Sequence, residues 1–243
     1  MKEKIKKELN FLKENNNKTF SYTLIFVTII LFIYCYFGSF SFFESNFASC
    51  KNLAYCKIIY HNIMAFILFF GVGSLFTKFV LKKPLGEFGL NYNNVGLGAK
   101  LCLIAIPICV LCGLSSCLDS SMQSTYPLIN LNIYGEWYFI ISYYISYLFY
   151  YIGWEYLFRG ILYFGSEEKC GAMASILITT LVSSLIHTSI GGFGKPMIET
   201  LSAIPAGIIF GFIVYKTRSI TYTTIIHFFV GLFTDICIFF IAK

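Results

Sequence analysis

The most regular feature of the sequence is the alternation of long apolar runs with short polar connections. Seven runs reach the roughly 20 mostly apolar residues that a helix needs to cross a bilayer. The stretch between the third and fourth runs is polar and predicts a loop. The pattern therefore predicts an all-α fold, a polytopic transmembrane helical bundle of about seven spans. The expected spans are about 20–43, 57–79, 95–116, 137–163, 171–190, 197–215 and 219–242.

Composition supports a membrane protein and excludes several other classes. Of the 243 residues, 57% are hydrophobic and 12% are charged, whereas an average soluble domain is about one quarter charged. This excludes a soluble enzyme and a disordered chain. The net charge of +6 does not indicate a nucleic-acid partner, because the lysines lie between apolar runs and not on one face. The nine scattered cysteines fit apolar filler.

Basic residues in the connections predict the orientation of the chain. Residues 1–19 form a lysine-rich tail, the connections 78–100 and 216–218 carry further basic residues, and 117–136 carries none. With seven spans, this distribution places the N-terminus in the cytoplasm and the C-terminus outside. We therefore expect residues 20–243 to form one domain of an integral membrane protein. The composition is rich in lysine, asparagine and isoleucine, which is typical of an AT-rich bacterial genome, so the expected location is a bacterial plasma membrane.

Two charged residues of the fourth run lie where lipid disfavours them. A charge at the middle of a bilayer costs at least about 2.5–3.5 kcal/mol on insertion scales. Glu155 and Arg159 are four residues apart, so a helix places them on one face with the acid on the favoured N-terminal side. The spacing fits a structural ion pair. It fits equally a carboxylate that its own arginine keeps ionised and oriented.

The turn between the fourth and fifth runs brings a histidine to the depth of this acid. The best turn signal is at residues 167–171, and a hairpin folded there returns His187 to about the level of Glu155. An acid and an imidazole on neighbouring helices can polarise a water, with one of them taking its proton. A satisfied interior histidine is the alternative.

The last run carries a stripe of unusual residues. His227, Gly231 and Asp235 follow one another at one-turn intervals near one helix face. This stripe fits close packing through a small residue, or a donor that stabilises negative charge on a substrate carbonyl. His61 has no partner at a recognisable spacing and is expected to be structural.

A second carboxylate follows the break after the fifth run. Glycine and proline in 191–196 end one helix and start the next. Glu199 then falls in the first turn of the sixth run, where the helix dipole favours an anion. It is either a helix-terminal charge or a carboxylate at the mouth of a cavity.

Taken together, these residues resemble the CPBP family of intramembrane endopeptidases, which comprises CAAX proteases and bacteriocin-processing enzymes. The family pattern is Glu-Glu-x-x-x-Arg, then Phe-x-x-x-His, then His-x-x-x-Asn or Asp. Residues 154–160, Trp-Glu-Tyr-Leu-Phe-Arg-Gly, are similar to the first motif. His187 is similar to the second motif and His227 to the third. The resemblance covers a motif-bearing core of residues 137–235.

The chain departs from the family pattern at three positions. Trp154 stands where the family has its first glutamate, Ser183 replaces the phenylalanine, and Gly231 replaces the asparagine or aspartate. Some members share a Trp-Glu start, a Lys-Pro-x-x-Glu-Thr segment (195–200 here) and a Thr-Arg-Ser-Ile run (217–220 here). The chain therefore resembles a variant branch of the family.

The resemblance implies hydrolysis of a peptide bond in a membrane-associated peptide or protein. In that interpretation Glu155 is the general base, held by Arg159, and His187 helps to activate the water. His227 donates to the oxyanion, with Asp235 or Glu199 in a supporting role. The site residues implied are Glu155, Arg159, His187 and His227, together with the supporting Glu199 and Asp235.

Three alternatives stay open at this stage. A zinc site of two histidines and a glutamate is possible, but no His-Glu-x-x-His spacing favours it, so we expect no cofactor. The tryptophan at the leading position allows a non-catalytic membrane partner, such as a maturation or immunity factor. Glu, Arg and His side chains within spans also allow a small proton-coupled transporter.

Overall fold

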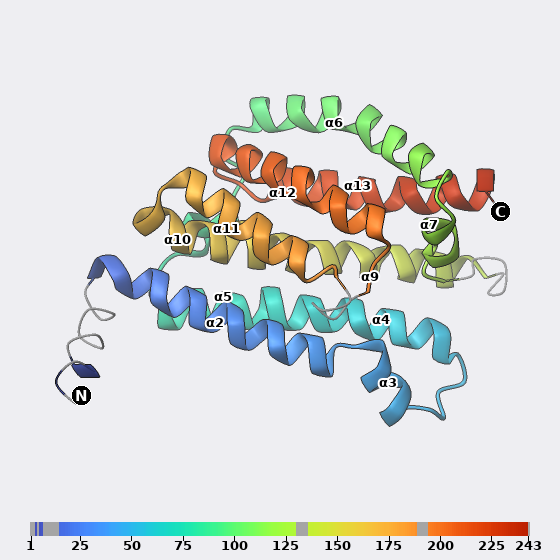
Figure 1. The fold of residues 1–243 in the computed structure, drawn as a ribbon, viewed down its shortest axis with the longest axis horizontal. Helices are drawn as coiled ribbons and strands as arrows, with labels where there is room; N and C mark the ends of the chain where they lie inside the picture. Colours follow the sequence, from blue (N-terminus) through green and yellow to red (C-terminus); the bar gives the residue numbers. More distant parts are fainter. Residues whose placement is uncertain (1–2, 4, 7–14, 130–135, 189–193, 243) are drawn as a thin grey trace.

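The computed structural model describes residues 15–129, 136–188 and 194–242, together with residues 3, 5 and 6. Across these residues every regular element is a helix, and the long helices lie side by side along the longest axis of the molecule (Figure 1). The all-α bundle predicted from the sequence is confirmed. In chain order the elements are α2 (Asn15–Phe37), α3 (Phe40–Asn46), α4 (Leu53–Ala65), η1 (Phe66–Val72), α5 (Gly73–Leu75), η2 (Phe76–Val80), η3 (Leu85–Phe88), α6 (Val95–Ser116), α7 (Ser120–Thr125), α9 (Trp137–Glu155), η4 (Tyr156–Leu162), α10 (Tyr163–Cys170), α11 (Ala172–Leu185), α12 (Met197–Thr217), α13 (Thr221–Cys237) and η5 (Ile238–Ala242).

Five helices are long and apolar enough to cross a membrane, and they agree with five of the predicted spans within a few residues at most ends. The third span is observed where it was predicted, at Val95–Ser116. The first ends early, because the helix stops at Gly38 and Ser39 caps the separate helix α3 by accepting from the Phe42 amide. The five are Asn17–Phe37, Leu53–Val80, Val95–Ser116, Met197–Thr217 and Thr221–Ala242.

The other two predicted spans form helices of a different kind. The helix predicted at 137–163 runs without a break from α9 through η4 to the end of α10. Residues 153–166 of this helix are all buried, because α2, α4, α11 and α13 pack around it. It contacts protein where other spans contact lipid, and so it tolerates polar side chains. We call the continuous stretch α9–η4–α10 the central helix.

The helix predicted at 171–190 is shorter than expected. The turn predicted at 167–171 is present, since α10 ends at Cys170 and Gly171 adopts a φ of +77°. The following helix α11 has 14 residues and ends at Leu185, which gives it a length of about 21 Å. His187 therefore lies in the turn after this helix and not inside it. Residues 189–193 of the predicted span and break lie outside the described residues.

One glycine lets the central helix approach its neighbour closely. A Cβ at Gly153 would lie 2.8 Å from the Ala65 carbonyl oxygen and 3.1 Å from the Phe66 Cα. Both atoms belong to the backbone of the facing helix, so neither can move aside. The two helices are thus in backbone contact at the residue directly before the motif, and this contact sets the position of the motif residues.

We expect Gly153→Ala to lower the thermal unfolding temperature of the purified protein in detergent. The added methyl group must push two helices apart, and overpacking of this kind costs about 1–3 kcal/mol. Gly96→Ala is the matched control, because a Cβ at Gly96 meets nothing within 4 Å. An unchanged unfolding temperature for Gly153→Ala would contradict the close contact.

A salt bridge ties the turn between α12 and α13 to the end of the central helix. Arg218 Nη1 lies 2.7 Å from Glu167 Oε1, and the Tyr163 hydroxyl donates to the same oxygen at 2.6 Å. Glu167 lies beyond the predicted span. Partial burial opposes its ionisation, but the hydrogen bonds from Arg218 and Tyr163 outweigh this effect and hold the pKa of Glu167 below its ordinary value.

This shift predicts a pH-dependent contribution to stability. A carboxyl whose pKa is lowered by folding stabilises the folded state above its unfolded pKa, about 4.3 for glutamate, and loses that contribution as the pH falls through the lowered value. Glu167→Gln should therefore lower the unfolding temperature at pH 7, and the difference from the unmodified protein should shrink below about pH 4. The exposed neighbour Glu168 provides the control variant Glu168→Gln.

Candidate functional site

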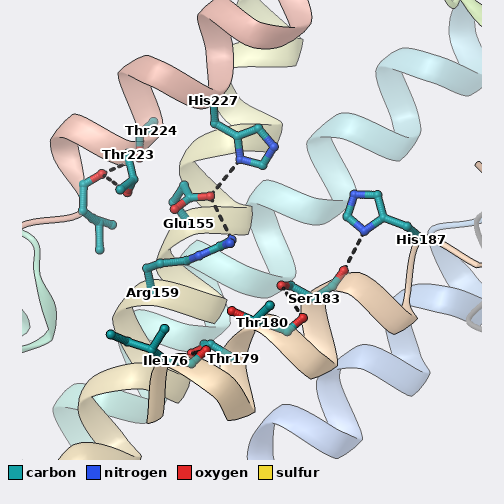
Figure 2. Close-up of polar contacts among 11 residues, drawn as sticks. Glu155, Arg159, Ile176, Thr179, Thr180, Ser183, His187, Thr223, Thr224 and His227 are labelled. Carbon is teal, nitrogen blue, oxygen red and sulfur yellow. Dashed lines mark hydrogen bonds and ion pairs between the residues drawn. The ribbon is translucent and has the colours of Figure 1, made fainter. Parts of the chain in front are cut away.

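The Glu155 carboxylate binds two basic side chains through one oxygen. Arg159 Nη1 lies 3.1 Å from Glu155 Oε1, and His227 Nδ1 lies 2.8 Å from the same atom (Figure 2). The ion pair predicted from the four-residue spacing is therefore formed. The contact with His227 joins the central helix to α13 across 72 residues of sequence.

This carboxylate is sealed from solvent. Glu155 has an exposed fraction of 0% and Arg159 of 3%. Among the described residues Glu155 Oε2 has no hydrogen-bond partner. The Thr223 hydroxyl lies beside the carboxylate (Figure 2), but it donates to the Ile220 carbonyl at 2.9 Å. Glu155 thus acts on its surroundings through His227 and Arg159.

A cavity of about 140 Å³ lies next to this ion pair. A volume of this size holds several water molecules. Six of its sixteen lining residues are phenylalanine, tyrosine or tryptophan, and three histidines, one acid and one lysine also face it. Glu155 and Arg159 do not line it. The lining residues are Cys35, Ser39, Phe40, His61, Thr125, Tyr126, Leu128, Tyr147, Tyr150, Tyr151, Trp154, His187, Gly194, Lys195, Glu199 and His227.

Two of these histidines, His227 and His187, turn Nε2 toward the cavity. His227 Nδ1 faces the Glu155 carboxylate, and His187 Nδ1 lies 2.6 Å from the Ser183 carbonyl oxygen. Both partners accept hydrogen bonds, so Nδ1 carries the proton and Nε2 of each neutral ring is an acceptor. Figure 2 shows the second nitrogen of each ring turned toward the space between the two histidines.

The predicted pairing of Glu155 with His187 is not present among the described contacts. The predicted depth is confirmed, because Trp154, the residue next to Glu155, contacts the His187 ring edge-on with centroids 5.3 Å apart. Successive helix residues point about 100° apart, so Trp154 faces His187 while Glu155 faces His227 on α13. The tryptophan thus occupies the position beside His187 from which an acid would reach it.

The two supporting acids have different environments. Glu199 lines the cavity, and both of its carboxylate oxygens accept from the Tyr126 hydroxyl, at 2.9 and 2.8 Å. Lys195 Nζ lies 3.5 Å from Glu199 Oε1 and donates to the Tyr126 oxygen at 2.5 Å. Asp235 is fully buried, accepts from the Tyr143 hydroxyl at 2.8 Å and does not line the cavity. Of the two acids, only Glu199 is in a position to meet a bound substrate.

Several cavity residues were not singled out by the sequence. Tyr126 lies in a polar loop, and Tyr147 and Tyr151 belong to a tyrosine-rich run in which no member stands out. Their four-residue spacing is the signal that places both on one helix face. His61 has the structural contacts expected of it, with Nδ1 2.7 Å from the Gly38 carbonyl oxygen and Nε2 2.9 Å from the Tyr34 hydroxyl.

The residues of this site do not form a ligand set for zinc. Glu155 Oε1 already contacts Arg159 and His227, and it lies outside the cavity that His187 lines. Across the described residues, no three or more His, Cys, Asp or Glu side chains are grouped so that they could hold a metal ion. The set of two histidines and one glutamate considered from the sequence therefore does not fit a metal here.

We expect Arg159→Met to destabilise the protein more than the double change Glu155→Gln and Arg159→Met. Removing one partner of a buried ion pair leaves an uncompensated charge and costs about 3–5 kcal/mol, whereas removing both charges costs less. Unfolding temperatures of the purified variants in detergent measure the difference. Equal losses in the single and double variants would show that Glu155 is not an anion that Arg159 compensates.

Comparison with known proteins agrees with this geometry. Residues 136–233 match the family model described as Type II CAAX prenyl endopeptidase Rce1-like. The matched range begins next to α9 and ends within α13, so it contains Glu155, Arg159, His187 and His227. No curated protein and no solved structure matches the chain. The 98 matched residues, out of 243, are similar to the CAAX prenyl endopeptidase family.

Proposed function

We propose that the protein is an intramembrane peptidase that hydrolyses a peptide bond of a membrane-associated substrate. The observation that carries the proposal is a cavity faced by two imidazoles, one of which is held from behind by a buried carboxylate. The aromatic walls suit an apolar or membrane-embedded peptide segment. The family match supports the same reaction class.

The arrangement favours His227 as the general base. A carboxylate on Nδ1 fixes the tautomer, so that the Nε2 lone pair points into the cavity, and it stabilises the imidazolium that forms when Nε2 takes a proton. Glu155 is buried and does not meet substrate. Its location therefore supports a positioning role through His227, in place of the general-base role expected from the sequence.

Arg159 keeps this positioning group charged. In a low-dielectric interior an isolated carboxylate would take up a proton and lose its attraction for the imidazole. The guanidinium 3.1 Å from Glu155 Oε1 counters that tendency. Since Arg159 also lies over the Phe210 ring, with its Cζ 5.4 Å from the ring centroid, its own charge is partly compensated by a cation–π contact.

The hydrolytic step follows from these positions. A water bound between the two histidines gives one proton to His227 Nε2 while its oxygen attacks the substrate carbonyl carbon. His187 Nε2 accepts a hydrogen bond from the other O–H of this water, which keeps its proton, and so orients the attack. The carbonyl oxygen becomes an anion, and its collapse breaks the carbon–nitrogen bond. The leaving amine takes the proton from the His227 imidazolium, which regenerates the neutral base.

A non-catalytic peptide-binding role is the second candidate, and Trp154 favours it. Its indole is 1% exposed, stacks on Tyr150 with centroids 5.6 Å apart and contacts His187. It makes the wall beside His187 apolar, which suits binding more than water activation. A proton pathway is less favoured, because Glu155 has no exposed surface from which to exchange protons.

Hydrolysis can be tested with purified protein in liposomes and a library of apolar, membrane-anchored peptides in ¹⁸O-labelled water. We expect cleavage products that carry ¹⁸O at the new carboxyl terminus. His227→Gln should lower kcat by about 10²–10⁴-fold, the usual contribution of a general base, and Glu155→Gln should lower it less. Gly96→Ala is the folded control with unchanged turnover.

The two candidate functions give different outcomes in this experiment. Saturable peptide binding without any labelled product would favour the non-catalytic role and overturn the peptidase proposal. Turnover that His227→Gln leaves unchanged would retain peptidase activity but remove His227 from the role of base.

A further inference from the structure

The space beside Gly231 is filled by a tyrosine hydroxyl. Gly231 lies one turn after His227, on the face of α13 that meets α9. A Cβ built at this position would lie 2.4 Å from the Tyr151 hydroxyl oxygen and 2.9 Å from both Cε1 and the hydroxyl of Tyr147. A side chain at position 231 and the observed Tyr151 hydroxyl therefore exclude each other. Because Gly231 has no side chain, the Tyr151 hydroxyl can occupy this space.

The phenol of Tyr151 is part of the wall that faces the reacting groups. Its ring centroid lies 4.4 Å from that of His227, and the two planes are tilted by 41°. Tyr151 lines the same cavity as His227 and His187. A substrate carbonyl attacked by a water on His227 would thus form its oxyanion next to this hydroxyl.

The surroundings of Tyr151 leave its proton available. The Tyr151 and Tyr147 hydroxyl oxygens lie 2.4 and 2.9 Å from the same point, the Cβ position at Gly231, so the two phenols are neighbours. A hydrogen bond donated by Tyr147 to the Tyr151 oxygen directs the Tyr151 proton elsewhere. A phenol that accepts one hydrogen bond becomes a better donor of the next, because bonds in a chain polarise one another.

The proposed mechanism needs a donor other than His227. Its Nδ1 proton is committed to Glu155, and its Nε2 enters the step as an acceptor. His187 is limited in the same way by the Ser183 carbonyl. Of the other cavity donors, the Tyr126 hydroxyl and the Lys195 ammonium already contact Glu199. The Tyr151 phenol packs directly against the His227 ring, which places its hydroxyl beside the oxyanion formed there.

We infer that Tyr151 is a further catalytic residue, whose hydroxyl donates a hydrogen bond to the oxyanion formed on the substrate carbonyl. The inference rests on the proposed peptidase function. The hydroxyl forms no covalent bond and keeps its proton through the step, and it strengthens its hydrogen bond as the carbonyl oxygen becomes negative. Gly231 is the positioning residue that leaves room for it.

Tyr151→Phe tests the inference, because it removes the hydroxyl and keeps the ring against His227. We expect kcat to fall by about 10²–10³-fold, the usual effect of removing one oxyanion donor, with KM unchanged for a peptide that the unmodified protein cleaves. Tyr156→Phe is the matched control. It also removes a buried phenol of the central helix, but one that donates to Thr77 at 3.1 Å and does not line the cavity.

Gly231→Ala provides a second, independent route to the same result. The methyl group must displace the Tyr151 hydroxyl, so kcat should fall in the otherwise unmodified protein. In a Tyr151→Phe background the same change should cost much less, because the displaced group is already absent. Additive losses in this double-mutant cycle would overturn the link between the two residues.

The outcomes separate this inference from the proposed function. Full kcat in Tyr151→Phe, with cleavage by the unmodified protein intact, overturns the role of Tyr151 and leaves the peptidase proposal standing. An equal loss in Tyr156→Phe overturns it as well, because the effect would then be structural. Absence of any cleavage by the unmodified protein overturns the peptidase proposal and, with it, the role of Tyr151.

Discussion

The Glu155 carboxylate is removed from solvent, and the rest of the site depends on how its charge is compensated. Arg159 supplies a full positive charge from the same helix, and His227 supplies a hydrogen bond from α13. The interaction joins the central helix to the last helix of the chain at one oxygen atom. It also fixes the rotation of the His227 ring. Loss of the compensation would leave a buried charge, so packing and chemistry depend on the same contact.

The sequence predicted this pair well because both partners lie on one helix, where spacing determines geometry. It also predicted that His227, Gly231 and Asp235 share a face: all three meet tyrosines or the acid of α9. The partner of Glu155 could not be predicted in the same way. Counting residues from a turn gives the depth of His187, but not the rotation of the central helix, and rotation decided that Glu155 meets His227.

The number of spans shows a second limit of prediction from the sequence. Hydropathy identifies segments that contact lipid, and the five helices with the strongest apolar character agree with the predicted spans. Residues 153–166 of the central helix contact protein on all sides, which an apolar run does not reveal. Its many tyrosines supply hydroxyl groups inside the bundle: the Tyr143 hydroxyl donates to Asp235, and those of Tyr147 and Tyr151 lie beside Gly231.

Two positions at which the chain departs from the motif it resembles, Trp154 and Gly231, are linked in space through Tyr151 of the central helix. Trp154 and Tyr151 are three residues apart on one face of that helix and line one cavity. With Trp154 in place of the motif glutamate, an indole and not an acid lies beside His187. Because Gly231 has no side chain, the Tyr151 phenol has room beside His227. With both changes, the polar groups lie around His227, whose imidazole contacts Glu155, the acid that Arg159 also contacts.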